Sequence, residues 1–139
     1  MNLPAEAMEL EAPIRVHCVS LRPDSGGPGR QRGGLGIVKE YEVLEGEVRF
    51  THRGERHMCA AQGEDGGHPG AMAISEIVRQ SGEREIIRSK LMALLRPGDR
   101  VVITTAGGGG NGRPGERDPN LLERDLLDGK VSNPQSYTA

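Results

Sequence analysis

Residues 24–36 restrict the fold of this chain most, because six of these thirteen residues are glycine. Glycine destabilises a helix, and it is placed where the backbone needs a positive φ or where another group approaches the main chain closely. A second glycine-rich segment, residues 106–112, follows a strand-like run. The two segments therefore predict two long irregular loops and indicate a site. Glycine spacing alone does not identify what such a site holds.

The composition predicts a single domain, residues 1–139, with a small core. The chain contains one Phe, two Tyr and no Trp, so it lacks the large side chains that dominate burial. Its 21 glycines raise the entropic cost of ordering the backbone. A net charge of −2 gives no reason for disorder. We therefore expect a chain that folds and that relies on a partner to cover further apolar surface.

The balanced charge and the short apolar runs exclude several classes of partner. The 18 basic and 20 acidic residues produce no overall attraction to nucleic acid or anionic lipid. The longest apolar runs are only a few residues, and no charged-then-apolar leader opens the chain. We therefore predict a cytoplasmic protein without a nucleic-acid or membrane partner.

Alternation of apolar and polar residues predicts a mainly β fold of the α+β class, with antiparallel strands, long Gly-rich loops and one C-terminal helix. The alternation slips at Val19 and Leu21, which a bulge would explain. The strands over residues 37–44 and 47–53 are predicted to form a hairpin through Glu45 and Gly46. Residues 71–79 fit either a short helix or a strand. The strand-like runs are residues 14–21, 37–44, 47–53, 84–91 (leading into 92–95) and 101–105.

The C-terminal helix has a start signal and a stop signal. Asp118 is a suitable N-cap, Pro119 fits the first helical position, and Gly129 fits the left-handed position after the helix. Asp125 is predicted to face solvent. The apolar stripe that faces the protein is predicted to be Leu121, Leu122 and Leu126.

The two ends of the chain are predicted to form an arm and a tail of the single domain. Residues 1–13 are short and acidic, and residues 5–12 have room for at most two helical turns, so we predict a docking arm. Residues 130–139 are predicted to form a polar tail.

Neither glycine-rich segment carries a complete nucleotide or nucleic-acid motif. Gly107, Gly109 and Gly112 have the spacing of a dinucleotide-binding loop, but the next helix begins only at Pro119. No lysine followed by Ser or Thr completes a phosphate-binding loop. The segment 30–34 is a single RGG-like fragment without aromatic neighbours, so its arginines are predicted to pin the loop through carboxylates or carbonyls.

The two cysteines are too few for a disulfide framework, but they are possible zinc ligands. His57 and Cys59 offer two ligands from one loop, and a strand is able to place Cys18 beside them. His17 or His52 would complete a tetrahedral site, although His17 and Cys18 point to opposite faces of a strand. The alternative is that the two cysteines are small buried apolar residues and that the histidines are scattered over the surface.

Seven short motifs follow one another along nearly the whole chain. They are residues 2–6 (NLPAE), 22–29 (RPDSGGPG), 32–36 (RGGLG), 97–100 (PGDR), 107–110 (GGGG), 116–119 (ERDP) and 127–132 (LDGKVS). Together they resemble the C-terminal segment of the hydantoinase B/oxoprolinase family. In that family the segment ends a much longer chain, so the resemblance implies a small, non-autonomous subunit.

The resemblance also implies an activity that belongs to a complex. It implies an ATP-dependent, biotin-independent carboxylase for a ketone of the acetophenone type, with bicarbonate as co-substrate. A hydantoinase A-like partner would hold ATP and a divalent metal, and a hydantoinase B-like partner would be completed by this chain. One alternative is an ATP-dependent hydrolase that opens hydantoin or oxoproline rings. An alternative of another class is a purely structural binding module.

The resemblance assigns no catalytic residue with certainty. The glycine-rich loops are expected to face the composite active site or the adjoining subunit, where main-chain amides stabilise charge and exclude water. The residues predicted for this role are Asp24, Ser25, Gly26, Gly27, Arg30, Arg32, Gly107, Gly108, Gly109 and Gly110.

Overall fold

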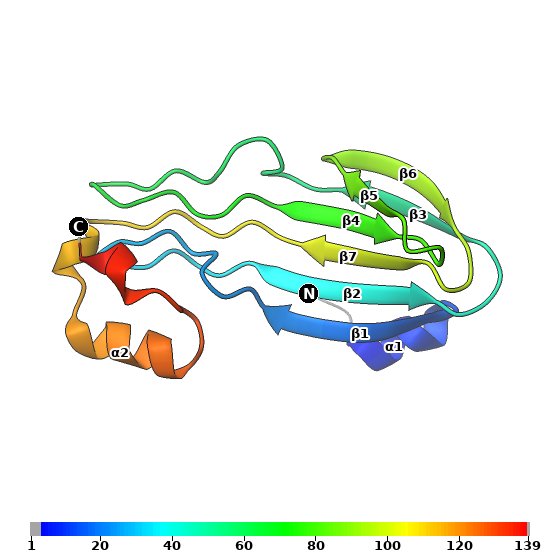
Figure 1. The fold of residues 1–139 in the computed structure, drawn as a ribbon, viewed down its shortest axis with the longest axis horizontal. Coiled ribbons are helices and arrows are strands. Elements are labelled where there is room, and N and C mark those ends of the chain that lie inside the picture. Colours follow the sequence, from blue (N-terminus) through cyan, green and yellow to red (C-terminus); the bar gives the residue numbers. More distant parts are fainter. Residues whose placement is uncertain (1–3, 139) are drawn as a thin grey trace.

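The computed structural model describes residues 4–138, which fold into two antiparallel sheets and two α-helices (Figure 1). The larger sheet has the strand order β1-β2-β7-β4-β5, and β3 pairs with β6 in the smaller sheet. No helix in this range is long and apolar enough to cross a membrane. The predicted mainly β fold is confirmed. The elements are α1 (Ala5–Glu11), β1 (Ile14–Leu21), β2 (Ile37–Val43), β3 (Val48–Arg53), β4 (Ile74–Val78), β5 (Arg84–Ile87), β6 (Lys90–Leu95), β7 (Arg100–Thr104) and α2 (Pro119–Leu127), with 3₁₀ turns at Pro114–Glu116 and Pro134–Tyr137.

Strand β1 contains the predicted irregularity. Its register with β2 shifts between Val16 and Cys18, so one extra residue lies in β1 at that point. Because side chains alternate along a strand, this residue moves every later side chain to the opposite face. Val19 and Leu21 therefore lie opposite Lys39 and Ile37, and the slip in the sequence pattern is accounted for.

The predicted hairpin between β2 and β3 is wrong, although both strands form. Strand β2 pairs with β1 and β7, whereas β3 leaves the larger sheet and pairs with β6. Val48 and Phe50 of β3 pack against the buried cluster of the larger sheet. Burying these side chains against the sheet face outweighs local pairing across the short turn at Gly46.

The predicted continuation of residues 84–91 into 92–95 is also divided between the sheets. Strand β5 ends at Ile87 and pairs with β4 in the larger sheet, while β6 begins at Lys90 and pairs with β3. Within residues 71–79, for which helix and strand were both open, residues 74–78 form strand β4, which lies between β7 and β5 in the larger sheet.

The core lies between the larger sheet and the β3-β6 pair. Its side chains occupy one face of the larger sheet, where Ile77 pairs with Val101 and Ser75 pairs with Ile87. Burial in so small a core matters for stability, because each aliphatic side chain removed from water contributes about 1.5–3 kcal/mol. The fully enclosed cluster is Val43, Ile77, Ile87, Leu95 and Val101.

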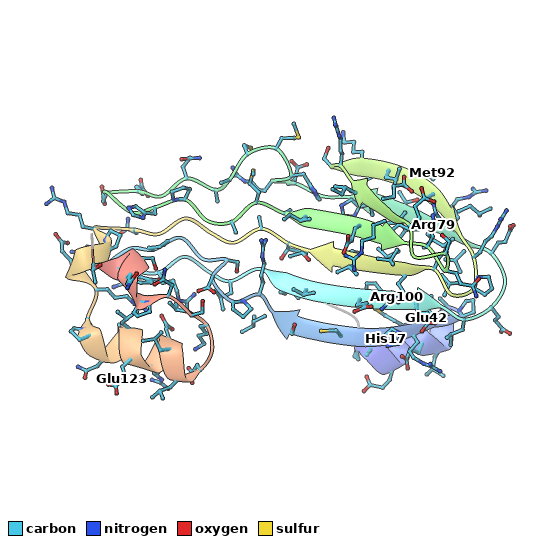
Figure 2. The ribbon with its side chains drawn as sticks, viewed as in Figure 1. His17, Glu42, Arg79, Met92, Arg100 and Glu123 are labelled. Atoms are coloured by element: carbon cyan, nitrogen blue, oxygen red, sulfur yellow. The ribbon has the colours of Figure 1, made fainter. Side chains whose placement is uncertain are left out.

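The opposite face of the larger sheet carries charged contacts between neighbouring strands (Figure 2), and near β5 it also exposes Ile74 and Ile86. His17 Nε2 lies 2.6 Å from Glu42 Oε2, and Arg100 Nη1 lies 2.7 Å from Glu40 Oε1. Exposed pairs of this kind contribute little to stability, so this face is solvated rather than structural.

Helix α2 begins and ends as predicted. The Asp118 carboxylate accepts a hydrogen bond from the Asn120 amide at 2.8 Å, and Gly129 has a φ of 65° just beyond the helix. The prediction that Asp125 faces solvent is wrong, since its exposed fraction is 5%. It is buried because two arginines from outside the helix surround it, and helical periodicity carries no information about such partners.

Both ends of the described chain are attached to the fold. Helix α1 lies beside β1, and Glu9 Oε1 accepts a hydrogen bond from the Val16 amide at 2.8 Å (Figure 1). Residues 1–3 of the predicted docking arm lie outside the described residues. In the predicted polar tail, Val131 and Tyr137 are 4% and 5% exposed, and residue 139 lies outside the described range.

Adjacent isoleucines on β5 test the assignment of the two sheet faces. Ile87 is 1% exposed and Ile86 is 74% exposed. Ile87→Ala should lower the free energy of unfolding by about 2–4 kcal/mol, because it leaves a cavity in the core. Ile86→Ala should change it by less than about 1 kcal/mol. Urea unfolding of both variants measures the difference, and equal losses would contradict the assignment.

Candidate functional site

The glycine-rich loops form one bundle that extends the larger sheet beyond the ends of its strands (Figure 1). We call residues 24–36, 60–71 and 105–112 the glycine bundle. Its segments exchange main-chain hydrogen bonds outside regular strands. Gly27 N donates to Gly108 O at 2.8 Å, Gly108 N to Gly34 O at 2.9 Å, and Ala71 N to Ser25 O at 2.8 Å. The structure therefore brings the two predicted loops together and adds a third segment, residues 60–71.

Close contact between backbones explains why glycine recurs in this bundle. A Cβ atom on Gly107 would lie 1.7 Å from Ser25 O, and one on Gly110 would lie 2.2 Å from Pro28 O. A Cβ on Gly33 would lie 2.0 Å from Gly108 O. No side chain fits at these distances without moving a backbone segment. The glycines thus permit the segments to pack against one another.

Ser25 closes the base of the first loop. It is fully buried, its hydroxyl donates to Arg22 O at 2.6 Å, and Gly36 N donates to its Oγ at 2.8 Å. The same side chain therefore joins the outgoing and the returning arm of the loop. This hydroxyl is occupied by structural hydrogen bonds on both its donor and its acceptor side.

Asp24 attaches the segment after α2 to the glycine bundle. It adopts a φ of 57°, and its carboxylate accepts hydrogen bonds from Ser132 N at 2.7 Å and from Ser132 Oγ at 2.6 Å. Asp24 N also donates to Lys130 O at 3.0 Å. The residue thus holds the C-terminal segment against the first loop.

Asp125 lies between two arginines at the outer end of the bundle. Its carboxylate is 2.9 Å from Arg32 Nε and 2.6 Å from Arg117 Nη2, and Asp125 and Arg117 have side chains only 7% exposed. Burial acts to raise the pKa of Asp125, but the hydrogen bonds and charges of Arg32 and Arg117 outweigh it, so the pKa lies below its usual value. The prediction that a carboxylate pins Arg32 is confirmed.

The remaining arginine of the RGG-like fragment is placed differently. Arg30 is exposed, and its carbonyl accepts a hydrogen bond from Arg117 Nη1 at 3.2 Å. Of the ten residues predicted to form the site, those buried inside the bundle are Ser25, Gly26, Gly27, Gly107 and Gly110. Asp24 and Arg30 are exposed, and Arg32, Gly108 and Gly109 are half-buried.

The structure places His57 beside His52, but among residues 4–138 no third predicted zinc ligand completes a site with them. Cys18 Sγ lies 3.4 Å from Ser20 Oγ on β1, Cys59 is exposed in a loop, and His57 Nε2 lies 3.2 Å from His52 Nε2. Across residues 4–138, no group of three or more His, Cys, Asp or Glu side chains is arranged to hold a metal ion. The zinc prediction therefore gains no support from the geometry.

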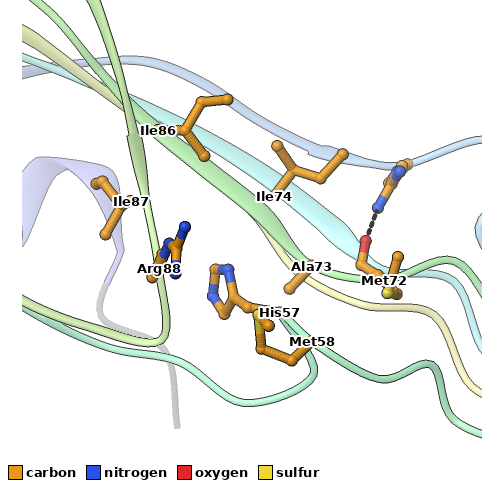
Figure 3. A pocket seen from close by; sticks show the side chains of 9 residues that line it. His57, Met58, Met72, Ala73, Ile74, Ile86, Ile87 and Arg88 are labelled. Carbon is orange, nitrogen blue, oxygen red and sulfur yellow. Dashed lines mark hydrogen bonds between the residues drawn. The ribbon is translucent and has the colours of Figure 1, made fainter.

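A pocket of about 560 Å³ opens beside β5, and we call it the basic apolar pocket (Figure 3). Three basic side chains line it, namely Arg22, His57 and Arg88. Burial of the neighbouring His52 lowers its pKa, and the charge of His57 lowers it further. Sequence reasoning missed this pocket, because four separate segments of the chain form it. Its apolar wall is Met58, Met72, Ala73, Ile74, Ile86 and Ile87.

The chain belongs to the hydantoinase B/oxoprolinase family, whose model matches residues 1–114. It is 38% identical over 99% of its length to an uncharacterised protein of Methanocaldococcus jannaschii, of which it covers 24%. It is 32% identical over 94% of its length to the B component of a putative D-/L-hydantoinase of a Pseudomonas strain, of which it covers 22%. The chain thus spans about a quarter of the length of the curated relatives it matches.

Two solved structures share the fold. The ATP-dependent caprolactamase of Pseudomonas jessenii matches 94% of this chain with a TM-score of 0.77 and 28% identity, and the match covers 23% of that protein chain. A nucleotide-free acetone carboxylase matches 96% of this chain with a TM-score of 0.78 and 20% identity, covering 22% of its own chain. Both of these enzymes are ATP-dependent.

A pair of glycine substitutions tests the backbone packing. Gly107→Ala should prevent the bundle from closing, because its Cβ would overlap Ser25 O. Gly34→Ala is the matched control, since no other atom would lie within 4 Å of the added Cβ. We expect a loss of about 3 kcal/mol or more for Gly107→Ala and a change within about 1 kcal/mol for Gly34→Ala. Chemical unfolding measures both, and a stable Gly107→Ala protein would contradict the packing.

Acid titration tests the charge cluster around Asp125. Asp125→Asn should cost about 2–4 kcal/mol at pH 7, because it leaves two arginines without their carboxylate. The folded-state pKa of Asp125 is depressed, so its stabilisation is present above the unfolded pKa and is lost as pH falls through the folded pKa. The difference in the free energy of unfolding between Asp125→Asn and the unsubstituted protein should therefore become smaller below about pH 4. Glu123→Gln, at an exposed residue of the same helix, is the control. A loss of stability for Asp125→Asn that does not change with pH would refute the assignment.

Proposed function

We propose that this chain is a non-autonomous component of an ATP-dependent enzyme complex, in which it completes a hydantoinase B-like subunit. The observation that carries this proposal is its near-complete alignment with one segment of much longer relatives, including an ATP-dependent caprolactamase. The proposal places the complex in the cytoplasm. A hydantoinase A-like partner would hold ATP and a divalent metal, and biotin takes no part.

Exposed apolar side chains support a role inside a larger assembly. Met58, Ile86 and Met92 are 77%, 74% and 66% exposed. Val19 and Leu21 at the end of β1 are more than half exposed as well. Apolar surface of this extent on a small domain is typical of interaction surfaces, because leaving it in water costs free energy.

The glycine bundle is proposed as a rigid surface that faces the composite active site or the adjoining subunit. Its loops are held by one another and by the Asp125 cluster, so their exposed surface is preorganised. Preorganised main-chain groups stabilise developing charge better than mobile ones, because they need no reorganisation during reaction. The residues buried within the bundle support this surface indirectly, while Asp24 and Arg30 are exposed on it.

The proposed reaction is carboxylation of a ketone, as in an acetophenone carboxylase. ATP would phosphorylate the ketone, in its enol form, and bicarbonate. Loss of inorganic phosphate from each would leave the enolate and carbon dioxide, and the enolate carbon would then attack the carbon dioxide. Such chemistry requires exclusion of water and stabilisation of an enolate oxygen. The shared fold with acetone carboxylase is consistent with this reaction.

Opening of a cyclic amide is the second candidate reaction. It is favoured by the relatives of higher identity, since the hydantoinase component is 32% identical and the caprolactamase structure is 28% identical. Both candidate reactions consume ATP. They differ in whether bicarbonate is a substrate.

Nucleotide turnover by the assembled complex separates the two reactions. The tagged chain is co-expressed with hydantoinase A-like and B-like chains, and native mass spectrometry establishes the assembly. ADP formation from an aromatic ketone that requires bicarbonate would identify the carboxylase. ADP formation from a cyclic amide without bicarbonate would identify the hydrolase. A chain that never joins such an assembly would overturn the proposed function.

Gly108→Ala distinguishes an active-site wall from a purely structural module. A Cβ at this position would lie 3.2 Å from Gly34 N, so a small shift accommodates it and assembly should persist. A role beside the active site predicts an assembled complex whose turnover falls by about tenfold or more. Unchanged turnover in the assembled variant would favour the structural module.

A further inference from the structure

We propose that the basic apolar pocket receives a segment of the hydantoinase B-like partner in which an aliphatic or aromatic side chain lies next to an Asp or Glu. This inference rests on the proposed function and adds the docking site and the chemistry of its occupant.

The wall of the pocket requires an apolar occupant. Ile86 and Met58 are 74% and 77% exposed, and Ile74 and Met72 are 52% and 46% exposed. These side chains gather around one opening (Figure 3). Covering them would remove a continuous apolar surface from water, which is the main favourable contribution in protein association. Methionine side chains are also able to adapt to the shape of a partner.

The charges of the pocket require an acidic occupant. Its lining contains Arg22, His57 and Arg88 and no Asp or Glu. Arg22 is engaged, because its Nη1 donates to Met72 O at 2.8 Å. Arg88 is exposed and makes no hydrogen bond or ion pair with any of residues 4–138. A carboxylate of the partner would therefore gain a charge-assisted hydrogen bond at Arg88 without displacing an existing one.

The position of β5 favours an extended segment. Strand β5 is the last strand of the larger sheet, and it contributes Ile86 and Ile87 to the pocket. An edge strand presents backbone groups with which another extended segment pairs. An occupant aligned along β5 would place one side chain over Ile86 and a neighbouring polar side chain near Arg88.

A second copy of this chain and a small ligand both fit the pocket less well than an acidic segment of a partner chain does. In a symmetric dimer built on this patch, the same basic side chains would face each other, and like charges repel. A small ligand is normally enclosed over most of its surface, whereas the walls here are themselves largely exposed. Charge and shape together favour a segment of a different, acidic chain.

Binding between purified partners tests this docking site. The tagged chain and the co-purifying hydantoinase B-like chain are separated, and their Kd is measured by biolayer interferometry. Ile86→Glu and Arg88→Glu should each weaken binding by about tenfold or more, because one places a charge in the apolar contact and the other repels the carboxylate. Binding should also weaken as NaCl is raised from about 50 to 500 mM.

Matched variants outside the pocket keep the test specific. Leu127→Glu changes an apolar residue that is 82% exposed on α2, and Arg15→Glu changes an exposed arginine on β1. Both should bind within about twofold of the unsubstituted chain, and circular dichroism should show that all four variants keep the fold.

Three outcomes would overturn the inference. If the unsubstituted chain binds the partner but Ile86→Glu and Arg88→Glu bind equally well, the docking site is wrong while the proposed function stands. If sedimentation shows that the chain self-associates through Ile86, a second copy is the occupant. If the unsubstituted chain does not bind a hydantoinase B-like chain at all, the proposed function fails and the docking site fails with it.

Discussion

Direct packing of backbone against backbone in the glycine bundle is the constraint on which this structure depends. Gly107 lies against Ser25, Gly110 against Pro28 and Gly33 against Gly108, at distances that leave no room for a Cβ atom. Main-chain hydrogen bonds between the same segments then replace those with water. Long irregular loops, which are usually mobile, are thereby held in one arrangement. This arrangement also fixes where the C-terminal segment attaches, through Asp24 and Asp125.

The scarcity of large side chains leaves the protein with a small apolar core. The enclosed core consists of five aliphatic residues, while many apolar side chains remain on the surface. Polar interactions supply part of the missing stabilisation, notably the buried carboxylate of Asp125 between two arginines. A second buried carboxylate, Asp99, accepts hydrogen bonds from the amides of Arg96 and Gln80 and from Arg79. Burial raises the pKa of Asp99, and these hydrogen bonds lower it by more. The remaining apolar surface is consistent with the proposed assembly.

The sequence predicted which segments form the candidate site, but it did not predict how these segments pack against one another. Glycine content identified residues 24–36 and 107–112, and the structure places them together. Their burial was not evident, because the partner of each glycine is a backbone segment elsewhere in the chain. The basic apolar pocket was missed, since Ile86 and Ile87 look equivalent in the sequence although one is exposed and the other buried. The family was recognisable from short motifs in their order, and the family match supports it.

The sequence by itself determined the local structure: the bounds of β1, its bulge, the capped helix α2 and the irregular path of the glycine segments. These features depend on neighbouring residues, through side-chain alternation, capping and backbone freedom. Only the tertiary structure decided that β3 pairs with β6 instead of β2, that the chain changes sheets between Ile87 and Lys90, and that Asp125 is buried. Each of these outcomes depends on burying a surface or a charge against residues distant in the chain, and local sequence patterns do not record such contacts.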